Sequence, residues 1–398
     1  MHTQDEAENN SAASHRSPAG PAPGAGRLGW LLAAAGIAGT AVAVTVRPTA
    51  ARLAAAQDWP PFVLVAGLLL IGLVADDDGL FAAAGYWLAR VARSPALLFA
   101  GATVIIGVVT AALNLDTSVA FLTPVLVYTA RGRGTAGPAL LYGCLLLSNA
   151  GSLLLPGSNL TNLIVLGHLH LSGGQFLARM WLPALCALTV TAGVVAWCER
   201  RSLRSGGTEP DRPPRPALGL GLAAVMVATA LVVILPGPAV PVAAAGVAVV
   251  GIRLAASRVR GRRVAEVLGI PVLVGLFGVA VALGTLGRAW SGPAALLTHL
   301  GTWATAGVAA AATVAVNNLP AASLLAARTP VHPFSLLVGL NLGPNLSVTG
   351  SLAWLLWQRA AAGAGARPSL RRAARIGALA VPLSMAAALG ALSLTGSH

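Results

Sequence analysis

Residues 114–118, Asn-Leu-Asp-Thr-Ser, place an amide, a carboxylate and two hydroxyls inside an otherwise apolar run. Such groups can hold a proton or a cation, and they can hydrogen-bond a solute rich in oxygen. Similar polar segments recur at 148–152, 157–162, 317–318 and 339–351. If they converge, they predict a substrate and ion site made by Asp116, Thr117, Asn149, Ser158, Asn159, Asn162, Asn317, Asn318, Asn341, Asn345, Ser347 and Thr349.

The composition indicates that these segments lie in a membrane. The chain has 398 residues, of which 56% are hydrophobic and 10% are charged. A soluble domain carries about 25% charged residues. Apolar segments close to the ~20 residues that span a bilayer recur from residue 29 onward. They are continuous blocks without the alternation of a membrane β-barrel. The sequence therefore predicts an all-α polytopic membrane protein.

The charge pattern orients the predicted spans. The formal charge is +14, and every basic residue is an arginine. Most arginines fall in short loops on one side of the predicted membrane, which indicates the cytoplasmic side rather than nucleic-acid binding. The exceptions are Arg47, Arg52, Arg179, Arg288 and Arg328, of which Arg288 and Arg328 are expected to snorkel outward.

This threading predicts about 9 full spans plus 2 re-entrant hairpins in the cytoplasmic membrane. Residues 1–26 form a polar cytoplasmic tail without the basic start of a secretory signal. The first span is thus expected to remain in the protein, and the C-terminus is expected outside. The predicted spans are 28–46, 60–76, 137–167, 176–198, 218–235, 239–254, 268–287, 334–358 and 376–394.

The two halves of the chain have the same order of elements. The first repeat, 27–199, has a hairpin at about 96–130 and a broken helix at about 137–167. A cytoplasmic linker, 200–216, leads to the second repeat, 217–398, with a hairpin at about 293–328 and a broken helix at about 334–358. The hairpins enter from opposite sides, which is typical of secondary transporters with inverted repeats. The alternative for each break is close helix packing by small residues.

Asp116 is the acidic residue that the threading places at mid-membrane depth. Asp58 is assigned to a span end or loop, and Asp76 to Asp78 to the solvated end of a helix. A carboxylate in the membrane is a functional-site hypothesis because its burial is costly, and a proton relieves that cost. The alternative is that Asp116 caps the second arm of its hairpin. A single such acid with no buried histidine does not predict an enzyme.

Several of these segments resemble the arsenite/antimonite permease family of the ion-transporter superfamily, over residues 60–395. The similar motifs are VNNLPAASLL at 316–325, GLNLGPNLSVTGSLAWLLW at 339–357, DTSVAFLTPV at 116–125 and SNLTN at 158–162. This chain differs from the family pattern at three positions. Leu115 and Asn341 stand where the family has Asn and Asp, and Asn345 stands where it has Lys.

The resemblance implies a proton-coupled antiporter that exports arsenite- or antimonite-like solutes. The expected partners are a small inorganic solute or anion, protons and membrane lipid. Relatives in the superfamily form dimers, which implies a homodimer here by analogy, and some family members use a soluble ATPase partner. No cofactor is expected, and a phosphate-binding loop of the Gly-x-x-x-x-Gly-Lys type is excluded because the sequence contains no lysine. The alternatives are a di- or tricarboxylate carrier, a sodium/proton antiporter or a passive channel. Carboxylate carriers of the superfamily usually have Ser-Asn-Thr at their hairpin tips, and neither tip here has it.

Overall fold

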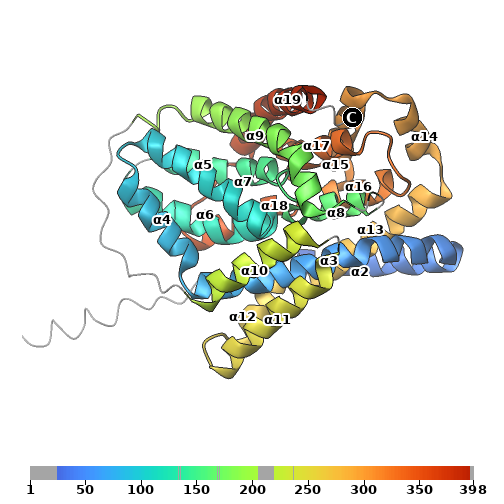
Figure 1. Ribbon diagram of the computed structural model, residues 1–398, viewed down its shortest axis with the longest axis horizontal. Coiled ribbons are helices and arrows are strands. Elements are labelled where there is room, and N and C mark those ends of the chain that lie inside the picture. Colours follow the sequence, from blue (N-terminus) through green and yellow to red (C-terminus); the bar gives the residue numbers. More distant parts are fainter. Residues whose placement is uncertain are drawn as a thin grey trace, which may run out of the picture.

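The computed structural model describes residues 25–132, 134, 136–167, 169, 171–204, 219–235 and 237–394, and its regular elements are helices (Figure 1). The first half contains α2 (Ala25–Val46), α3 (Pro48–Asp77), α4 (Leu80–Val91), α5 (Pro95–Ala112), α6 (Leu115–Gly132), α7 (Gly137–Gly151), η1 (Pro156–Ser158), α8 (Leu160–Leu166) and α9 (Gly173–Cys198). The second half contains α10 (Leu220–Ile234), α11 (Ala239–Ala255), α12 (Gly261–Leu268), α13 (Ile270–Ala289), α14 (Gly292–His299), α15 (Thr302–Val316), α16 (Asn318–Leu325), α17 (Pro333–Leu342), η2 (Gly343–Leu346), α18 (Ala353–Gly363) and α19 (Leu370–Leu394).

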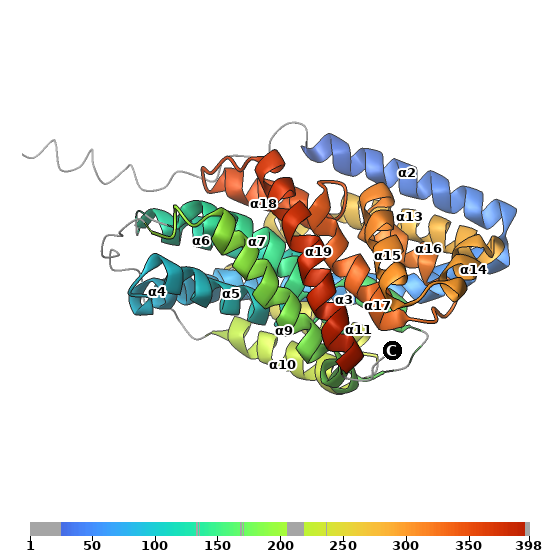
Figure 2. The same ribbon diagram turned by 90° about the horizontal axis from the view of Figure 1, so that it is seen from above.

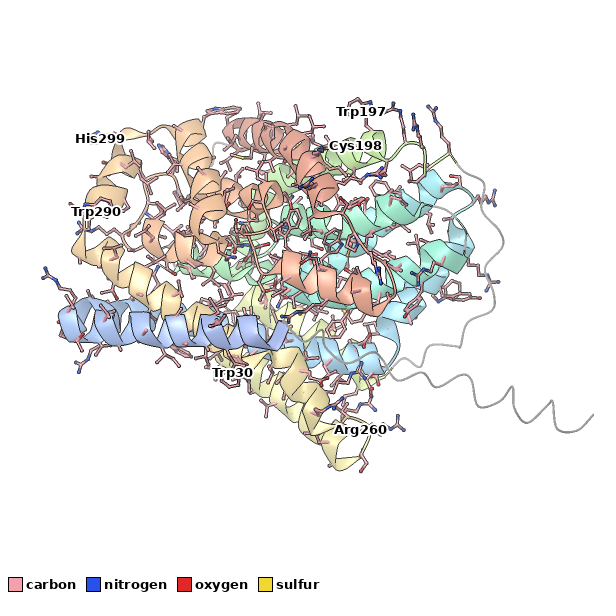
Figure 3. The ribbon with its side chains drawn as sticks, turned by 180° about the vertical axis from the view of Figure 1, so that it is seen from behind. Trp30, Trp197, Cys198, Arg260, Trp290 and His299 are labelled. Carbon is pink, nitrogen blue, oxygen red and sulfur yellow. The ribbon has the colours of Figure 1, made fainter. Side chains whose placement is uncertain are left out.

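The helices confirm the all-α membrane fold. Six segments within the described residues are long and apolar enough to cross a membrane, and most other predicted spans are shorter apolar or broken helices. Trp30, Trp197 and Trp290 are exposed at the ends of α2, α9 and α13 (Figure 3). Tryptophans at such positions anchor helices at the two membrane interfaces.

A layer of long helices, α2, α3, α11 and α13, runs along one side of the molecule (Figure 1). Glycines allow the helices of this layer to cross with their backbones close together. A Cβ atom on Gly36 of α2 would lie 2.3 Å from the carbonyl oxygen of Gly275 in α13. A Cβ atom on Gly246 of α11 would lie 2.6 Å from the carbonyl oxygen of Gly67 in α3. Because lipid supplies no hydrophobic drive between helices, such close backbone contact is what holds them together.

Gly36→Ala is therefore expected to destabilise the protein by about 1–3 kcal/mol, because its methyl group meets backbone that cannot move away. Gly193→Ala in α9 is the matched control, since nothing lies within 4 Å of its Cβ position. The control should be neutral or stabilise by up to ~1 kcal/mol through helix propensity. Thermal unfolding of both variants in detergent measures the difference, and equal midpoints would contradict this account of the crossing.

The start of α3 differs from the predicted span. The sequence predicts a span that begins at Pro60, whereas the helix begins at Pro48 and contains Pro60 and Pro61. Proline is tolerated inside membrane helices because neighbouring groups compensate for the lost backbone hydrogen bond. Asp58, assigned from the sequence to a span end or loop, therefore lies inside a helix and is only 1% exposed.

The two hairpins and two broken helices are present. In the first half, α5 and α6 form a hairpin, and the following helix is interrupted between α7 and α8. In the second half, α15 and α16 form the hairpin, and the next helix is interrupted between α17 and α18. Figure 2 shows the two hairpins, α5–α6 and α15–α16, on either side of α9 and α19, which pack against each other. The second half of each broken helix crosses to the other hairpin, since α18 packs against α6 and α8 packs against α16. The first arm of the second hairpin is shorter than predicted, because α14 is a separate helix.

Ion pairs tie the arginine-rich ends of the helices together. Arg253 pairs with Asp78, which also accepts a hydrogen bond of 2.7 Å from the Gly221 amide. Arg263 pairs with Asp76 at 2.7 Å. The run from Asp76 to Asp78, expected to be solvated, is instead half-buried or buried against arginines from the second half of the chain. Its arrangement supports a structural role.

Candidate functional site

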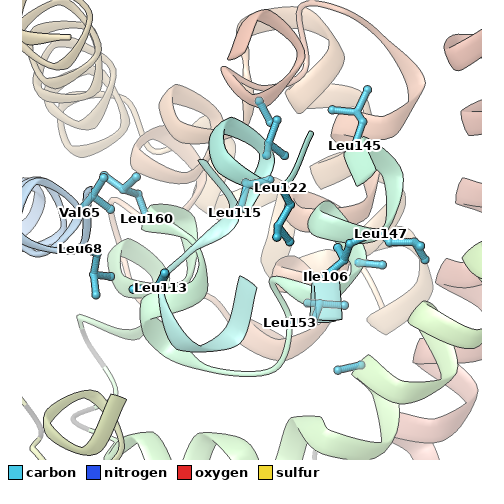
Figure 4. Close-up of a cluster of buried hydrophobic side chains, with 14 of the residues drawn as sticks. Val65, Leu68, Ile106, Leu113, Leu115, Leu122, Leu145, Leu147, Leu153 and Leu160 are labelled. Carbon is cyan, nitrogen blue, oxygen red and sulfur yellow. The ribbon is translucent and has the colours of Figure 1, made fainter. Parts of the chain in front are cut away.

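The first hairpin turns at Asn114, and this residue caps the second arm. The Asn114 Oδ1 atom accepts a hydrogen bond of 2.7 Å from the Thr117 amide. Asp116, in the first turn of α6, accepts no side-chain hydrogen bond from the described residues. Leu113 and Leu115 are buried among Val65, Leu68 and other apolar side chains (Figure 4). Asn114, and not Asp116, therefore caps the N-terminus of α6.

The second hairpin turns at Asn317 in a strained conformation, with φ 79° and ψ 152°. The Asn317 Oδ1 atom accepts from the Leu319 amide at 3.3 Å, and its Nδ2 atom donates to the Thr349 carbonyl at 3.1 Å. The backbone N–H group of Asn318 donates to the Gly350 carbonyl at 2.8 Å. These bonds fix the tip of the hairpin to the second break. Backbone strain of this kind persists where the surrounding structure enforces it, as at functional sites.

Comparing Asn317→Ala with Asn317→Gly isolates that strain, because both variants lose the same side-chain hydrogen bonds. Glycine reaches this backbone conformation without a Cβ clash, whereas alanine does not. We expect the alanine variant to be less stable than the glycine variant by about 1–3 kcal/mol. Thermal unfolding in detergent measures the gap. Identical midpoints would mean that the tip relaxes to another conformation.

The two tips face each other across a small cavity, here called the tip cavity. It has a volume of about 20 Å³, which is room for about one water molecule. Its charged lining residue is Asp116, and no lining residue among those described is basic. Its lining residues are Phe62, Leu115, Asp116, Asn159, Leu160, Leu273, Leu276, Asn317, Asn318, Leu319, Ser351 and Leu352. Both hairpins and both breaks therefore contribute polar groups to one place.

Four other asparagines form a separate cluster, here called the amide brace: Asn149, Asn162, Asn341 and Asn345. They are at most 1% exposed and do not line the tip cavity. The Asn341 amide group donates to Asn162 at 2.8 Å and accepts from Asn159 at 2.7 Å and from Ser152 at 2.5 Å. Asn149 donates to Asn345 at 2.9 Å. These hydrogen bonds join the first broken helix to the second.

The brace explains the two departures from the permease pattern. Asn341 and Asn345 stand where that family has Asp and Lys, and here each one bonds an asparagine of the first break. An amide both donates and accepts, so the asparagines can bond to one another without burying charge. The Asn149 Oδ1 atom is the exception in this cluster, since it is buried and has no hydrogen-bond partner among the described residues. A buried acid or base would need a partner of opposite charge. Asn159 connects the tip cavity to the amide brace, because it lines the cavity and donates to Asn341.

The remaining predicted site residues lie apart from the tip cavity. Ser158 is buried and exchanges hydrogen bonds with the backbone of Leu155. Thr117 is fully buried, and its hydroxyl has no hydrogen-bond partner among the described residues. Thr349 is exposed and bonds Ser347 at 2.5 Å. Of the predicted set, the tip cavity brings together Asp116, Asn159, Asn317 and Asn318, and Ser351 joins them.

Asp58 is the acidic residue that the sequence reasoning misplaced. Its carboxylate lies in α3 and accepts a hydrogen bond of 3.4 Å from the Ser323 hydroxyl in α16. Asp116 is therefore not alone at membrane depth. One signal in the sequence could have located Asp58, because Pro48 is the kind of residue that opens a helix at its first position. A helix from Pro48 carries Asp58 well inside the span.

An inverted pair of hairpins and broken helices around a polar cavity defines a secondary transporter of the ion-transporter kind. Residues 25–343 match the citrate transporter family (CitMHS), and the chain belongs to that family. The resemblance to arsenite and antimonite permeases is a finer assignment and stays a prediction.

Among solved structures, the crystal structure of the YdaH transporter from Alcanivorax borkumensis is similar over 84% of this chain and 84% of that one. The sequence identity is 16% and the TM-score is 0.45. No curated protein matches the chain.

Proposed function

We propose that this protein is a proton-coupled transporter in which Asp116 carries the coupling proton. The polar residues around the tip cavity bind the solute in a conformation in which the two hairpin tips lie further apart, because the cavity of about 20 Å³ seen here has room for only about one water molecule. The observation that supports this is the position of Asp116, an acid without a hydrogen-bond donor among the described residues, in a cavity whose other polar lining groups are three amides and a hydroxyl. A carboxylate in such a place is stabilised either by a proton or by a bound solute. Exchange between these two states couples proton movement to solute movement.

The solute that this lining favours is small, uncharged and rich in hydroxyl groups, as are the trihydroxides of arsenic and antimony. The amides of Asn159, Asn317 and Asn318 can both donate to and accept from hydroxyl groups. None of the described residues that line the cavity is basic, so none of them could neutralise an anion. Export of the solute in exchange for protons is the direction that the permease motifs imply.

A di- or tricarboxylate is the second candidate, and two observations favour it. The chain belongs to the citrate transporter family. In addition, α6 and α16 both begin at the tip cavity, and a helix N-terminus carries a partial positive charge. With Asp116 protonated, these helix ends could hold a carboxylate, and the proton and the anion would then move together. Sodium in exchange for protons is the third alternative.

Transport into everted membrane vesicles distinguishes these solutes. The vesicles come from a strain that lacks its own arsenic exporters and produces this protein. Arsenite accumulation that collapses with a protonophore supports the leading proposal. Uptake of labelled citrate without arsenite uptake selects the carboxylate carrier. If neither solute moves while the protein is present in the membrane, both proposals fail and sodium exchange becomes the next assay.

We place the protein in the cytoplasmic membrane with its arginine-rich helix ends in the cytoplasm. Arg253, Arg263 and Arg372 lie at that end, where they pair with acidic residues. This orientation puts the N-terminus inside and the C-terminus outside. A homodimer and a soluble ATPase partner stay predictions from the permease resemblance.

A further inference from the structure

Asp58 is a buried carboxylate with one oxygen left free. It is 1% exposed, and its Oδ1 atom accepts the hydrogen bond from Ser323. Its Oδ2 atom is buried and has no hydrogen-bond partner among the described residues. A buried ionised carboxylate is costly unless it is paired and hydrogen-bonded. The free oxygen is therefore a site where a proton would be stabilising.

The charged surroundings of Asp58 are simple. Helices α8 and α16 carry no ionisable side chain, and α13 brings only Arg288. The Arg288 guanidinium interacts with Asp58 electrostatically but forms no salt bridge with it. Instead, Arg288 donates to the Gln57 side chain and, at 3.0 Å, to the Gly284 carbonyl. Arg288, expected to snorkel outward, is thus turned in toward α3, because Gln57 offers it an acceptor.

A second cavity, here called the wide cavity, opens beside Asp58. Its volume is about 1120 Å³, and Gln57, Pro60 and Pro61 of α3 form part of its wall. Three arginines line it, Arg47, Arg288 and Arg328, and none of its described lining residues is acidic. In the proposed orientation this cavity faces the outside of the cell. It is large enough to hold many water molecules.

Asp58 also lies next to the tip cavity. Phe62, one helical turn after Asp58 in α3, lines the tip cavity. So does Leu319, which is one turn before Ser323 in α16. One turn of helix is about 5.4 Å. The Asp58 and Ser323 pair therefore lies between the wide cavity on one side and the cavity of Asp116 on the other.

We infer that Asp58 relays the coupling proton between the wide cavity and Asp116. This inference rests on the proposed proton coupling at Asp116. A proton from water in the wide cavity binds the free oxygen of Asp58. It then passes to the Asp116 carboxylate through the water-sized tip cavity, and Asp58 returns to its ionised form. Ser323 positions the Asp58 carboxylate, and the Gln57–Arg288 pair lies at the entrance to the relay.

The first test needs no solute. Infrared spectra of the purified protein in liposomes, recorded in acidic and alkaline buffer, show buried carboxyl groups that gain a proton. We expect Asp58→Asn to remove one such band and Asp116→Asn another. After a pH jump, the Asp116 band should respond about a hundredfold more slowly in Asp58→Asn than in the wild type. An unchanged response rate or an unchanged set of bands would overturn the relay.

The second test uses arsenite as the probe and separates coupling from transport. In Asp58→Asn, uphill accumulation driven by a pH gradient should fall about a hundredfold. Exchange of labelled for unlabelled arsenite needs no net proton movement and should remain. A parallel loss of both would show that Asp58 is merely structural. Ser323→Ala should give an intermediate loss of accumulation, and Glu266→Gln, whose side chain is 51% exposed, should behave as the wild type.

The two tests keep the inference separate from the proposed function. If the wild type transports no arsenite, the leading solute assignment fails, and the infrared titration alone decides the role of Asp58. If the wild type accumulates arsenite and Asp58→Asn accumulates it equally well, the proposed function stands and the relay is wrong.

Discussion

Replacement of Asp116 by asparagine is expected to abolish proton-driven transport. The amide keeps the size of the side chain but cannot bind and release a proton. Since Asp116 is the charged residue of the tip cavity, no neighbouring lining group can replace it. Accumulation of solute in everted vesicles should fall by a factor of at least about 10², to the level of vesicles without the protein.

Asp116→Glu is the informative companion variant. It keeps the titratable group but lengthens the side chain in a cavity of about 20 Å³, so partial activity is expected. Glu266→Gln serves as the control for loss of an exposed carboxylate. Full proton-driven accumulation by Asp116→Asn would remove Asp116 from the coupling step. Asp58, which is buried in α3, would then be the first alternative carrier.

Replacement of Asn341 by leucine is expected to cause the largest loss of stability. The variant removes the partner of Asn159 and of Asn162 inside a region without solvent. Each buried polar group left without a partner costs about 1–3 kcal/mol. The free energy of unfolding should fall by about 3 kcal/mol or more. Thermal unfolding in detergent, together with the yield of folded protein from the membrane, measures the loss.

Asn318→Leu is the matched control for the amide brace. Asn318 is also a buried asparagine, and it lines the tip cavity. Its side chain forms no hydrogen bond with any of the described residues, whereas its backbone amide donates to Gly350. Its replacement should change the unfolding midpoint little and should reduce transport strongly. If both variants lost the same stability, the division between a structural brace and a binding cavity would be incorrect.

The architecture was largely predictable from the sequence, because it depends on local patterns. The length of each apolar run sets the spans, and the positions of arginine order them. The polar segments at 114–118 and 317–318 mark the hairpin tips that the structure contains. Gly157 to Asn162 and Gly339 to Ser351 mark the two breaks in the same way. These features can be recognised within a window of about twenty residues.

The roles of the individual polar residues were not predictable in the same way. The sequence placed Asn149, Asn159, Asn162, Asn341 and Asn345 in one proposed site. The structure divides them, with Asn159 at the tip cavity and the other four in the amide brace. The hydrogen bond between Asn149 and Asn345 joins residues 196 positions apart. A local pattern carries no information about which partner, at that separation, completes a hydrogen bond.

The sequence by itself determined that this is an all-helical membrane protein with two hairpins, two broken helices and polar groups at their tips. Only the tertiary structure decided that Asn114 caps the helix that carries Asp116, and that Asp58 lies buried against Ser323. The physical reason is the difference in range. Spans and breaks follow from the transfer of neighbouring residues into lipid, whereas the burial and pairing of a polar group depend on which distant helices pack around it.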